Sequence, residues 1–193
     1  MTNVDILSLL EDKLKDFTLH SDFEQRSVGD KIENICKSIV KEQYPNKYKK
    51  AKSKRSIEDF SLIGNDFIQY FDVKTHFIQE RGFSMPNLIS IDRLRKTLSD
   101  VNKSLSYIFI SYHRVDGEIK VSNIHIKYVW ELDWSILRIG ALGKGQLQIR
   151  NANNDFVFTD IGRDRWFDVL KKEAPKFYIN EIQKIENYIH NWS

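Results

Sequence analysis

The sequence predicts an α/β fold in which helices pack on a small mixed sheet. Segments 4–17 and 28–43 carry apolar residues at helical spacing, with charged residues between them. Two pairs of short segments rich in β-branched and aromatic residues follow, and each pair is joined by a turn-forming sequence, as in β-hairpins. Of the 193 residues, 41% are hydrophobic and 30% are charged, which is typical of a globular protein with one substantial core.

Turn and breaker residues set the bounds of these elements. Pro45 ends the second helix, because proline disfavours helical backbone at the residue before it. The first hairpin joins segments 56–63 and 67–75 through Gly64-Asn65-Asp66. Further along we expect a helix (91–102), a second strand pair (105–112 with 118–128), a loop with three glycines (138–145) and a short strand (146–150). Two helices, separated by Pro175, are expected at 162–172 and 177–192. We expect one domain over residues 1–193, with N-terminal helices (1–45), a sheet with its loops (56–150) and C-terminal helices (161–193).

Composition narrows the class of protein. The longest apolar runs, such as residues 107–110, are much shorter than a membrane span, and the amphipathic helix expected from residue 4 is unlike a signal peptide. The single cysteine, Cys36, cannot form an internal disulfide, so we expect a reducing, cytoplasmic location. The net charge of +3 and pI near 8.8 permit a nucleic-acid partner without requiring one. The five histidines lack the spacing of a zinc site, and the eight glycines form no nucleotide-binding motif.

Residues suited to catalysis gather on the first hairpin. We expect Asp59 on its first strand, and Asp72 and Lys74, two residues apart on the second, project from one face. Two neighbouring carboxylates repel each other, and a divalent cation offsets that repulsion. Glu33, on the preceding helix, could supply a further carboxylate. An aspartate and a lysine at this spacing also fit a surface ion pair, but here they interrupt an apolar strand, where charges are costly unless paired or bound to metal.

The same residues resemble a known nuclease motif. Asp59 with Asp72-Val73-Lys74, and Glu33 upstream, resembles PD-(D/E)xK. The order Phe71-Asp72-Val73-Lys74-Thr75, then Met85-Pro86-Asn87-Leu88-Ile89-Ser90, is similar to type II restriction endonucleases of the HincII and EcoRV-like branch. Segment 29–42 resembles the glutamate-bearing helix of that family, and matching pieces of its C-terminal half are found at 146–148 and 165–166. The resemblance spans about residues 25–172.

The resemblance implies a restriction endonuclease-like PD-(D/E)xK core and a homodimeric, Mg²⁺-dependent enzyme. Such an enzyme cuts both strands of double-stranded DNA at a short palindromic site, leaving blunt ends with 5′-phosphate and 3′-hydroxyl groups. By position, Asp59 and Asp72 are metal ligands, Val73 offers its backbone carbonyl to the metal, and Lys74 is the catalytic lysine. Glu33 is an auxiliary acid near the site. A cognate DNA methyltransferase encoded nearby is a further expectation.

The resemblance also indicates which residues read DNA bases. Asn87 matches a base-reading asparagine, whose amide both donates and accepts hydrogen bonds, and Ser84 and Met85 precede it in a loop that approaches DNA. Ser84 stands where the family has an intercalating glutamine, and Gly140 where it has a second DNA-contacting asparagine. These departures imply a relaxed centre of the recognition site, of the GTNNAC type.

Basic residues are candidates for contacts to DNA phosphates. Six of the nine residues in 47–55 are basic, and this run, with Lys52 and Lys54, leads directly to Asp59. A solvated loop is an equally good reading of such a run. Lys144, among the glycines of 138–145, is a second candidate, beside the alternative of a plain flexible loop.

Two other functions remain open at this point. A DNA repair or mobile-element nuclease on the same core predicts nicking or structure-guided cleavage in place of a fixed digestion pattern. A DNA-binding module with a structural acidic cluster predicts binding without metal-dependent cleavage.

Overall fold

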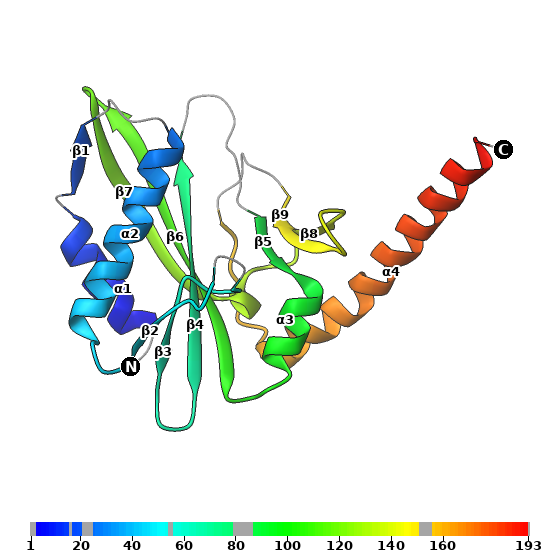
Figure 1. Ribbon diagram of the computed structural model, residues 1–193, viewed down its shortest axis with the longest axis horizontal. Helices are drawn as coiled ribbons and strands as arrows, with labels where there is room; N and C mark the ends of the chain where they lie inside the picture. The colour runs from blue at the N-terminus through cyan, green and yellow to red at the C-terminus, as the bar shows by residue number, and fades with distance from the viewer. Residues whose placement is uncertain are drawn as a thin grey trace.

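The computed structural model describes residues 3–15, 17–20, 25–53, 56–78, 87–150 and 156–192. Figure 1 shows how their helices and strands are arranged. The helices are α1 (Asn3–Leu14), α2 (Gln25–Gln43), α3 (Ile91–Leu98) and α4 (Arg163–His190), with a 3-10 turn, η1 (Val129–Glu131). The strands are β1 (Thr18–His20), β2 (Tyr48–Lys50), β3 (Phe60–Ile63), β4 (Ile68–Phe77), β5 (Asn87–Ser90), β6 (Lys103–Val115), β7 (Glu118–Tyr128), β8 (Leu137–Gly140) and β9 (Gln146–Ile149).

A six-stranded sheet in the order β1-β7-β6-β4-β3-β2 forms the centre of the molecule. The pairing of β4 with β6 is parallel, and the other described pairings in this sheet are antiparallel, so the sheet is mixed. The predicted hairpin is the β3–β4 pair, closed by a hydrogen bond from the Gly64 N–H to the Phe67 carbonyl at 2.9 Å. The α/β class with a mixed sheet flanked by helices is therefore confirmed.

One face of the large sheet is covered by α1 and α2, shown in blue and cyan in Figure 1. Alternate residues of β4, including Phe71 and Val73, project into this first core, because successive strand side chains point to opposite faces. Gly29 lets α2 approach β4 closely, since an added Cβ there would lie 2.7 Å from the Thr75 hydroxyl. This close approach brings α2, with Glu33, beside the hairpin.

The opposite face of the large sheet is covered by α3, α4 and a small sheet in the order β5-β9-β8. Trp166 of α4 is completely buried in this second core, and its indole N–H donates to the Leu132 carbonyl at 2.8 Å. The intervening residues of β4, including Tyr70, face this side. Asp72 and Lys74 follow Tyr70 at the same period of two and so face the second side as well.

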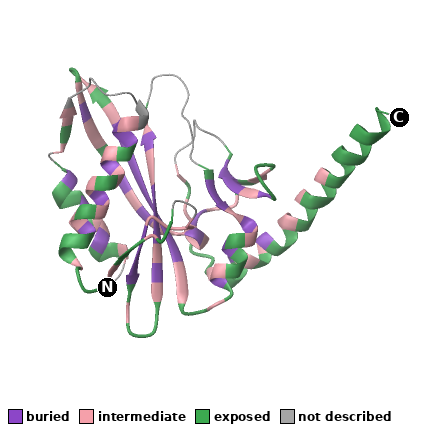
Figure 2. Ribbon diagram, in the orientation of Figure 1, coloured by how far each residue is buried: buried purple, intermediate pink, exposed green. Residues whose placement is uncertain are grey.

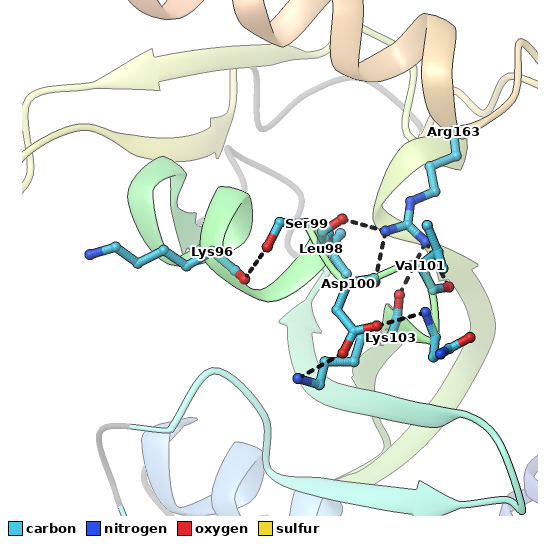
Figure 3. A network of polar contacts seen from close by, with 8 residues as sticks. Lys96, Leu98, Ser99, Asp100, Val101, Lys103 and Arg163 are labelled. Atoms are coloured by element: carbon cyan, nitrogen blue, oxygen red, sulfur yellow. Dashed lines mark hydrogen bonds and ion pairs between the residues drawn. The ribbon is translucent and has the colours of Figure 1, made fainter.

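Arg163 connects the start of α4 to the turn between α3 and β6. Its guanidinium donates to the carbonyls of Leu98, Asp100, Val101 and Lys103 (Figure 3). It also lies over the Trp130 ring, 5.3 Å from the centroid. The last carbonyls of a helix have no intrahelical partner, so this side chain satisfies groups that would otherwise need water.

Several expected boundaries were wrong. The loop expected at 138–145 begins as a strand, because β8 pairs with β9 and buries Leu137 in the second core. The expected helix 91–102 ends at Leu98, where Ser99 to Asn102 turn and the Asn102 N–H donates to the Asp100 carboxylate at 3.0 Å. Asp59 lies one residue before β3, although its N–H still donates to the Phe71 carbonyl at 2.8 Å.

Pro175 does not separate two helices, since α4 is continuous through it. Proline removes one backbone hydrogen bond, to the carbonyl of Lys171, and both residues are exposed, so water can satisfy that carbonyl. The second half of α4 extends away from the rest of the molecule, and Figure 2 shows it almost entirely exposed. Within the described residues, α4 and the other helices lack the combination of length and apolar character needed to cross a membrane.

Candidate active site

Asp59, Asp72 and Lys74 converge at the β3–β4 hairpin. The Asp59 Oδ2 atom accepts a hydrogen bond of 2.8 Å from the Val73 N–H, which fixes that carboxylate against β4. The Lys74 Nζ atom lies 2.8 Å from Asp72 Oδ1 and 2.7 Å from Oδ2. The two aspartates are within side-chain hydrogen-bonding reach of each other. The structure therefore brings together the three residues that the sequence singled out first.

Asp72 lies in surroundings that oppose its negative charge. It is only 9% exposed, and Tyr107, its neighbour in the β4–β6 ladder, is completely buried beside it. Burial raises the pKa of Asp72 to about 7; Lys74 partly counters this rise, and the Asp59 charge adds to it. Strongly perturbed carboxylates of this kind in a cleft are typical of functional sites.

A polar cleft of about 850 Å³ opens above this cluster. Asp59, Asp72 and Lys74 lie in its wall, together with residues of α2, α3, β5 and the turn between β8 and β9. Basic side chains reach it from four separate elements: Lys37, Lys50, Arg93 and Lys144. The lining also carries acidic side chains, Glu33, Glu58, Asp59, Asp72 and Asp92, so the cleft combines cationic groups that suit a phosphate ligand with carboxylates that suit a metal ion.

Glu33 lines the same cleft but is held away from the aspartate pair. Its carboxylate forms a 2.6 Å ion pair with Lys37, one helical turn further along α2. Burial lowers the pKa of Lys37, but the hydrogen bond and charge of Glu33, with the charge of Asp59, outweigh this and raise it. Glu33 thus holds a cation in the cleft, close enough to Asp59 for the Asp59 charge to act on it.

The residues present fit a magnesium ion of the two-carboxylate type. In the described part of the chain, no three or more histidine, cysteine, aspartate or glutamate side chains form a metal-binding cluster. Mg²⁺ binds hard oxygen ligands, keeps several waters and is commonly held in enzymes by one or two carboxylates plus substrate phosphate. Asp59, which is half-buried, and Asp72, which is buried, supply that number, and a divalent cation would relieve the repulsion between them.

Asn87 and Gly140 lie on the small sheet, in a row of polar side chains. The Gln148 side chain of β9 donates to the Asn87 side-chain oxygen at 2.8 Å and accepts from Arg138 Nε at 3.1 Å. A Cβ added at Gly140 would collide with the Gln148 amide, so Gly140 leaves room for that side chain. Arg138 and Gln148 were missed from the sequence, where the polar alternation of 138, 146 and 148 was the available signal.

The remaining predicted DNA contacts are divided among several places. Lys144 lines the cleft, and its backbone carbonyl accepts a 2.8 Å hydrogen bond from the Tyr178 hydroxyl. Lys52 lines an adjoining hollow, which Lys50 also borders. Lys54, Ser84 and Met85 lie outside the described residues.

Comparison with known proteins gives a structural relative. No family model matches the chain, and no curated protein matches it. A solved structure, the NlaIV restriction endonuclease, is similar with a TM-score of 0.55 and 15% sequence identity, over 84% of this chain and 72% of that chain. At this identity the likeness shows a shared fold, that of a mixed sheet flanked by helices as found in a restriction endonuclease, and it does not distinguish the HincII branch from others.

Proposed function

We propose that this chain, which shares the fold of a restriction endonuclease, is a Mg²⁺-dependent nuclease that hydrolyses phosphodiester bonds of double-stranded DNA. The observation that carries the proposal is the buried Asp72, in contact with Lys74 and beside Asp59, in a cleft lined by both acidic and basic side chains. A buried carboxylate beside a half-buried one contributes little to stability, and a cation held between them would explain why both are present.

Each residue of the cluster has a role in this chemistry. Asp59 and Asp72 would hold Mg²⁺, with the Val73 carbonyl as a third oxygen ligand. The bound metal stabilises charge that develops on the phosphate and lowers the pKa of a coordinated water. The Val73 N–H keeps Asp59 in place, so the ligand geometry depends on the rigid hairpin and not on a loop. Lys74, whose Nζ atom lies 2.7 Å from Asp72 Oδ2, would orient the attacking water and stabilise the negative transition state.

The walls of the cleft suit the remainder of the substrate. Lys37, Lys50, Arg93 and Lys144 surround the aspartate pair and would contact phosphates on either side of the bond that is cut. Outside the cleft lining, the exposed Asn87 and Arg138, joined through the buried Gln148, carry amide and guanidinium groups of the kind that hydrogen-bond base edges in the major groove. The hydrogen bonds within the row fix each amide orientation, and Arg138 remains exposed at its end.

The finer proposal is a type II restriction endonuclease of the HincII-like branch. It would act as a homodimer on a short palindromic site, cut both strands to leave blunt 5′-phosphate and 3′-hydroxyl ends, and be accompanied by a cognate methyltransferase. Asn87 would read bases at that site, with Ser84 and Met85 in the preceding loop, Gly140 accommodating Gln148, and Lys52 and Lys54 reaching phosphates. Glu33 would act as an auxiliary acid through Lys37.

Incubation of plasmid DNA with the protein and Mg²⁺ tests the proposal. Discrete fragments are expected, and Lys74→Ala should slow their formation by about a hundredfold or more, because a transition-state contact of this kind is worth that much. The chain supplies a matched control: Glu118 and Lys120 of β7 repeat the acid-x-lysine spacing on an exposed strand, with their charged atoms 3.6 Å apart. Lys120→Ala should leave cleavage unchanged.

The outcome separates the candidate functions. A ladder of fixed fragments supports restriction, whereas nicks or cuts at junctions support a repair or mobile-element nuclease on the same fold. Retarded DNA with no cleavage in Mg²⁺ or Mn²⁺ would indicate a binding module. Equal cleavage by the wild type, Lys74→Ala and Lys120→Ala would contradict the assigned site.

A further inference from the structure

The hollow that adjoins the active-site cleft has a volume of about 840 Å³ and a strongly basic lining. Among the described residues, one acidic side chain, that of Glu58, lines it together with five basic ones: Lys49, Lys50, Lys52, Arg93 and Lys96. The cleft is balanced by comparison, because five basic and five acidic side chains of the described residues line it. Of these two spaces, the hollow therefore carries the excess positive charge.

The floor of the hollow is largely apolar. It belongs to the β3–β4 hairpin near its turn, where Ile63, Ile68 and Tyr70 line the hollow and are only partly buried. The β3–β4 register pairs Ile63 with Ile68 and Ser61 with Tyr70, so these four residues lie side by side on one face of the sheet. An apolar and aromatic floor with a cationic rim matches a nucleotide, which has an apolar base face next to an anionic phosphate.

The hollow and the cleft are continuous with each other. Lys50, Glu58 and Arg93 line both spaces. Tyr70 lines the hollow and Asp72 lines the cleft, and their side chains leave the same face of β4 two residues apart. At a rise of about 3.3 Å per residue, their Cα atoms are about 7 Å apart along the strand. A DNA strand with a phosphate at Asp72 is therefore close enough to place a neighbouring nucleotide over Tyr70.

A paired nucleotide does not match this floor. In duplex DNA the base faces are stacked inside the helix, so a protein meets phosphates and base edges. An unpaired base, by contrast, presents its whole face, which can stack on an aromatic side chain whatever the sequence. The floor around Tyr70 thus favours an unpaired nucleotide, and the basic rim favours the phosphates on either side of it.

We propose that the hollow binds an unpaired nucleotide of the DNA strand that is cut, next to the cleaved bond. The base lies on the floor beside Tyr70, and the phosphates contact the rim at Lys49, Lys52 and Lys96. This inference rests on the proposed nuclease function and specifies the form of its substrate, which is a duplex with a single-stranded tail or with a nucleotide displaced from the helix. It also gives a role to the described lysines of the basic run 47–55.

Fluorescence anisotropy with the full chain in the presence of chelator tests the proposal, because binding is then measured apart from cleavage. One labelled probe is a blunt duplex, and the other is a shorter duplex with a single-stranded tail and the same total number of phosphates. The tailed probe should bind about tenfold more tightly, which is within the range that stacking of one base on an aromatic side chain contributes. Equal affinities for the two probes would overturn the proposal and leave the nuclease function standing.

Two variants of the hollow separate stacking from charge. Tyr70→Leu removes the aromatic ring and keeps an apolar side chain, so the ratio of the two affinities should fall towards one. Tyr188→Leu, at a 65% exposed position of α4, is its matched control and should keep the wild-type ratio.

Lys49→Ala with Lys96→Ala changes exposed side chains and leaves the packing of the cores intact. It should reduce the slope of log affinity against log salt concentration for the tailed probe by about 1.4, at about 0.7 for each phosphate contact on a single strand. Lys120→Ala with Lys171→Ala removes the same charge elsewhere and should leave this slope unchanged. Wild-type behaviour of both Tyr70→Leu and the Lys49 and Lys96 double variant would overturn the proposal.

Two further measurements distinguish this proposal from its alternatives. A free nucleoside triphosphate also combines a base with phosphates, and tighter binding of that nucleotide than of the tailed probe would refute the assignment to a DNA strand. Added Mg²⁺ then tests the chemistry separately. Tight binding of the tail without cleavage would refute the nuclease function and leave the hollow as a site for unpaired DNA. Binding of neither probe would refute both proposals.

Discussion

Replacing Asp72 by asparagine should change how the stability of the protein depends on pH. The wild-type carboxyl has a pKa raised from 3.8 to about 7 in the folded state. Between these values the folded protein keeps a proton that the unfolded chain has released, so the free energy of unfolding falls as pH rises. The fall is complete above the folded pKa. Asparagine does not titrate, so Asp72→Asn lacks this fall.

The size of the effect follows from the shift. About three pH units at 1.36 kcal/mol each give about 4 kcal/mol. The stability of Asp72→Asn relative to the wild type should therefore rise by about 4 kcal/mol between about pH 4 and about pH 8. Any constant cost of leaving Lys74 without its partner moves the whole difference curve and leaves its slope unchanged.

Urea unfolding followed by tryptophan fluorescence, with chelator present, measures this difference. Asp66→Asn, in the exposed turn of the same hairpin, is the matched control and should parallel the wild type at every pH. Added Mg²⁺ should stabilise the wild type above pH 7 and have little effect on Asp72→Asn. If the free energy of unfolding depended on pH in the same way for the wild type and Asp72→Asn, the raised pKa of the buried Asp72 carboxyl would be refuted.

Three further outcomes are expected. Arg163→Ala should lower the free energy of unfolding by about 2–3 kcal/mol, because backbone carbonyls lose a charged donor. Arg165→Ala, on the exposed side of α4, is the control and should leave it unchanged. Equal melting temperatures of the two variants would contradict this role of Arg163. Lys144→Ala should weaken binding to all DNA sequences alike and reduce the slope of log affinity against log salt concentration by about one. Titration of labelled duplexes at several salt concentrations measures both effects, with Lys120→Ala as control. Asn87→Ala should reduce discrimination at one base pair by about 1–3 kcal/mol while other positions keep theirs. Cleavage of substrates changed one base pair at a time measures this, and uniform loss at all positions would argue against base reading.

The core of the candidate site could be predicted because its determinants are local. Two apolar segments separated by a short turn form a hairpin in almost any context, and the turn fixes the register that brings Asp59 near Asp72. The period of two along a strand then places Lys74 beside Asp72. The structure adds the hydrogen bond from Val73 to Asp59, which depends on Asp59 lying just before the strand.

Contacts between distant segments could not be predicted in the same way. Asn87 and Gln148 are 61 residues apart, and their hydrogen bond depends on how β5 and β9 pair, which only the folded second core determines. From the sequence, Gly140 was interpreted as the loss of a DNA-contacting asparagine. In the structure it leaves room for the Gln148 side chain, which an added Cβ would meet. Glu33 was placed on the correct helix, but the sequence did not show that Lys37, four residues on, would hold its carboxylate.

Pro175 illustrates a local rule that was overridden. Proline ends helices because it removes a hydrogen bond and crowds the preceding turn, and that cost is smaller where the freed carbonyl faces water. Lys171, whose carbonyl is freed, is exposed. The continuous α4 that results was not expected, and its outer part leaves the body as an exposed helix.

β4 is hydrogen-bonded to β6 along its whole length and to β3 over Ile68–Phe71, with apolar cores on both of its faces. Local opening free energies in a protein are highest for such interior strands and lowest for small peripheral units. Amide protons of residues 68–71, which lie in both ladders, should therefore exchange with solvent only when the whole protein unfolds, while those of the three-stranded β5-β9-β8 sheet exchange through smaller, more frequent openings. The part of the molecule assigned to bond cleavage would thus keep its geometry while the part assigned to base reading adapts to its ligand.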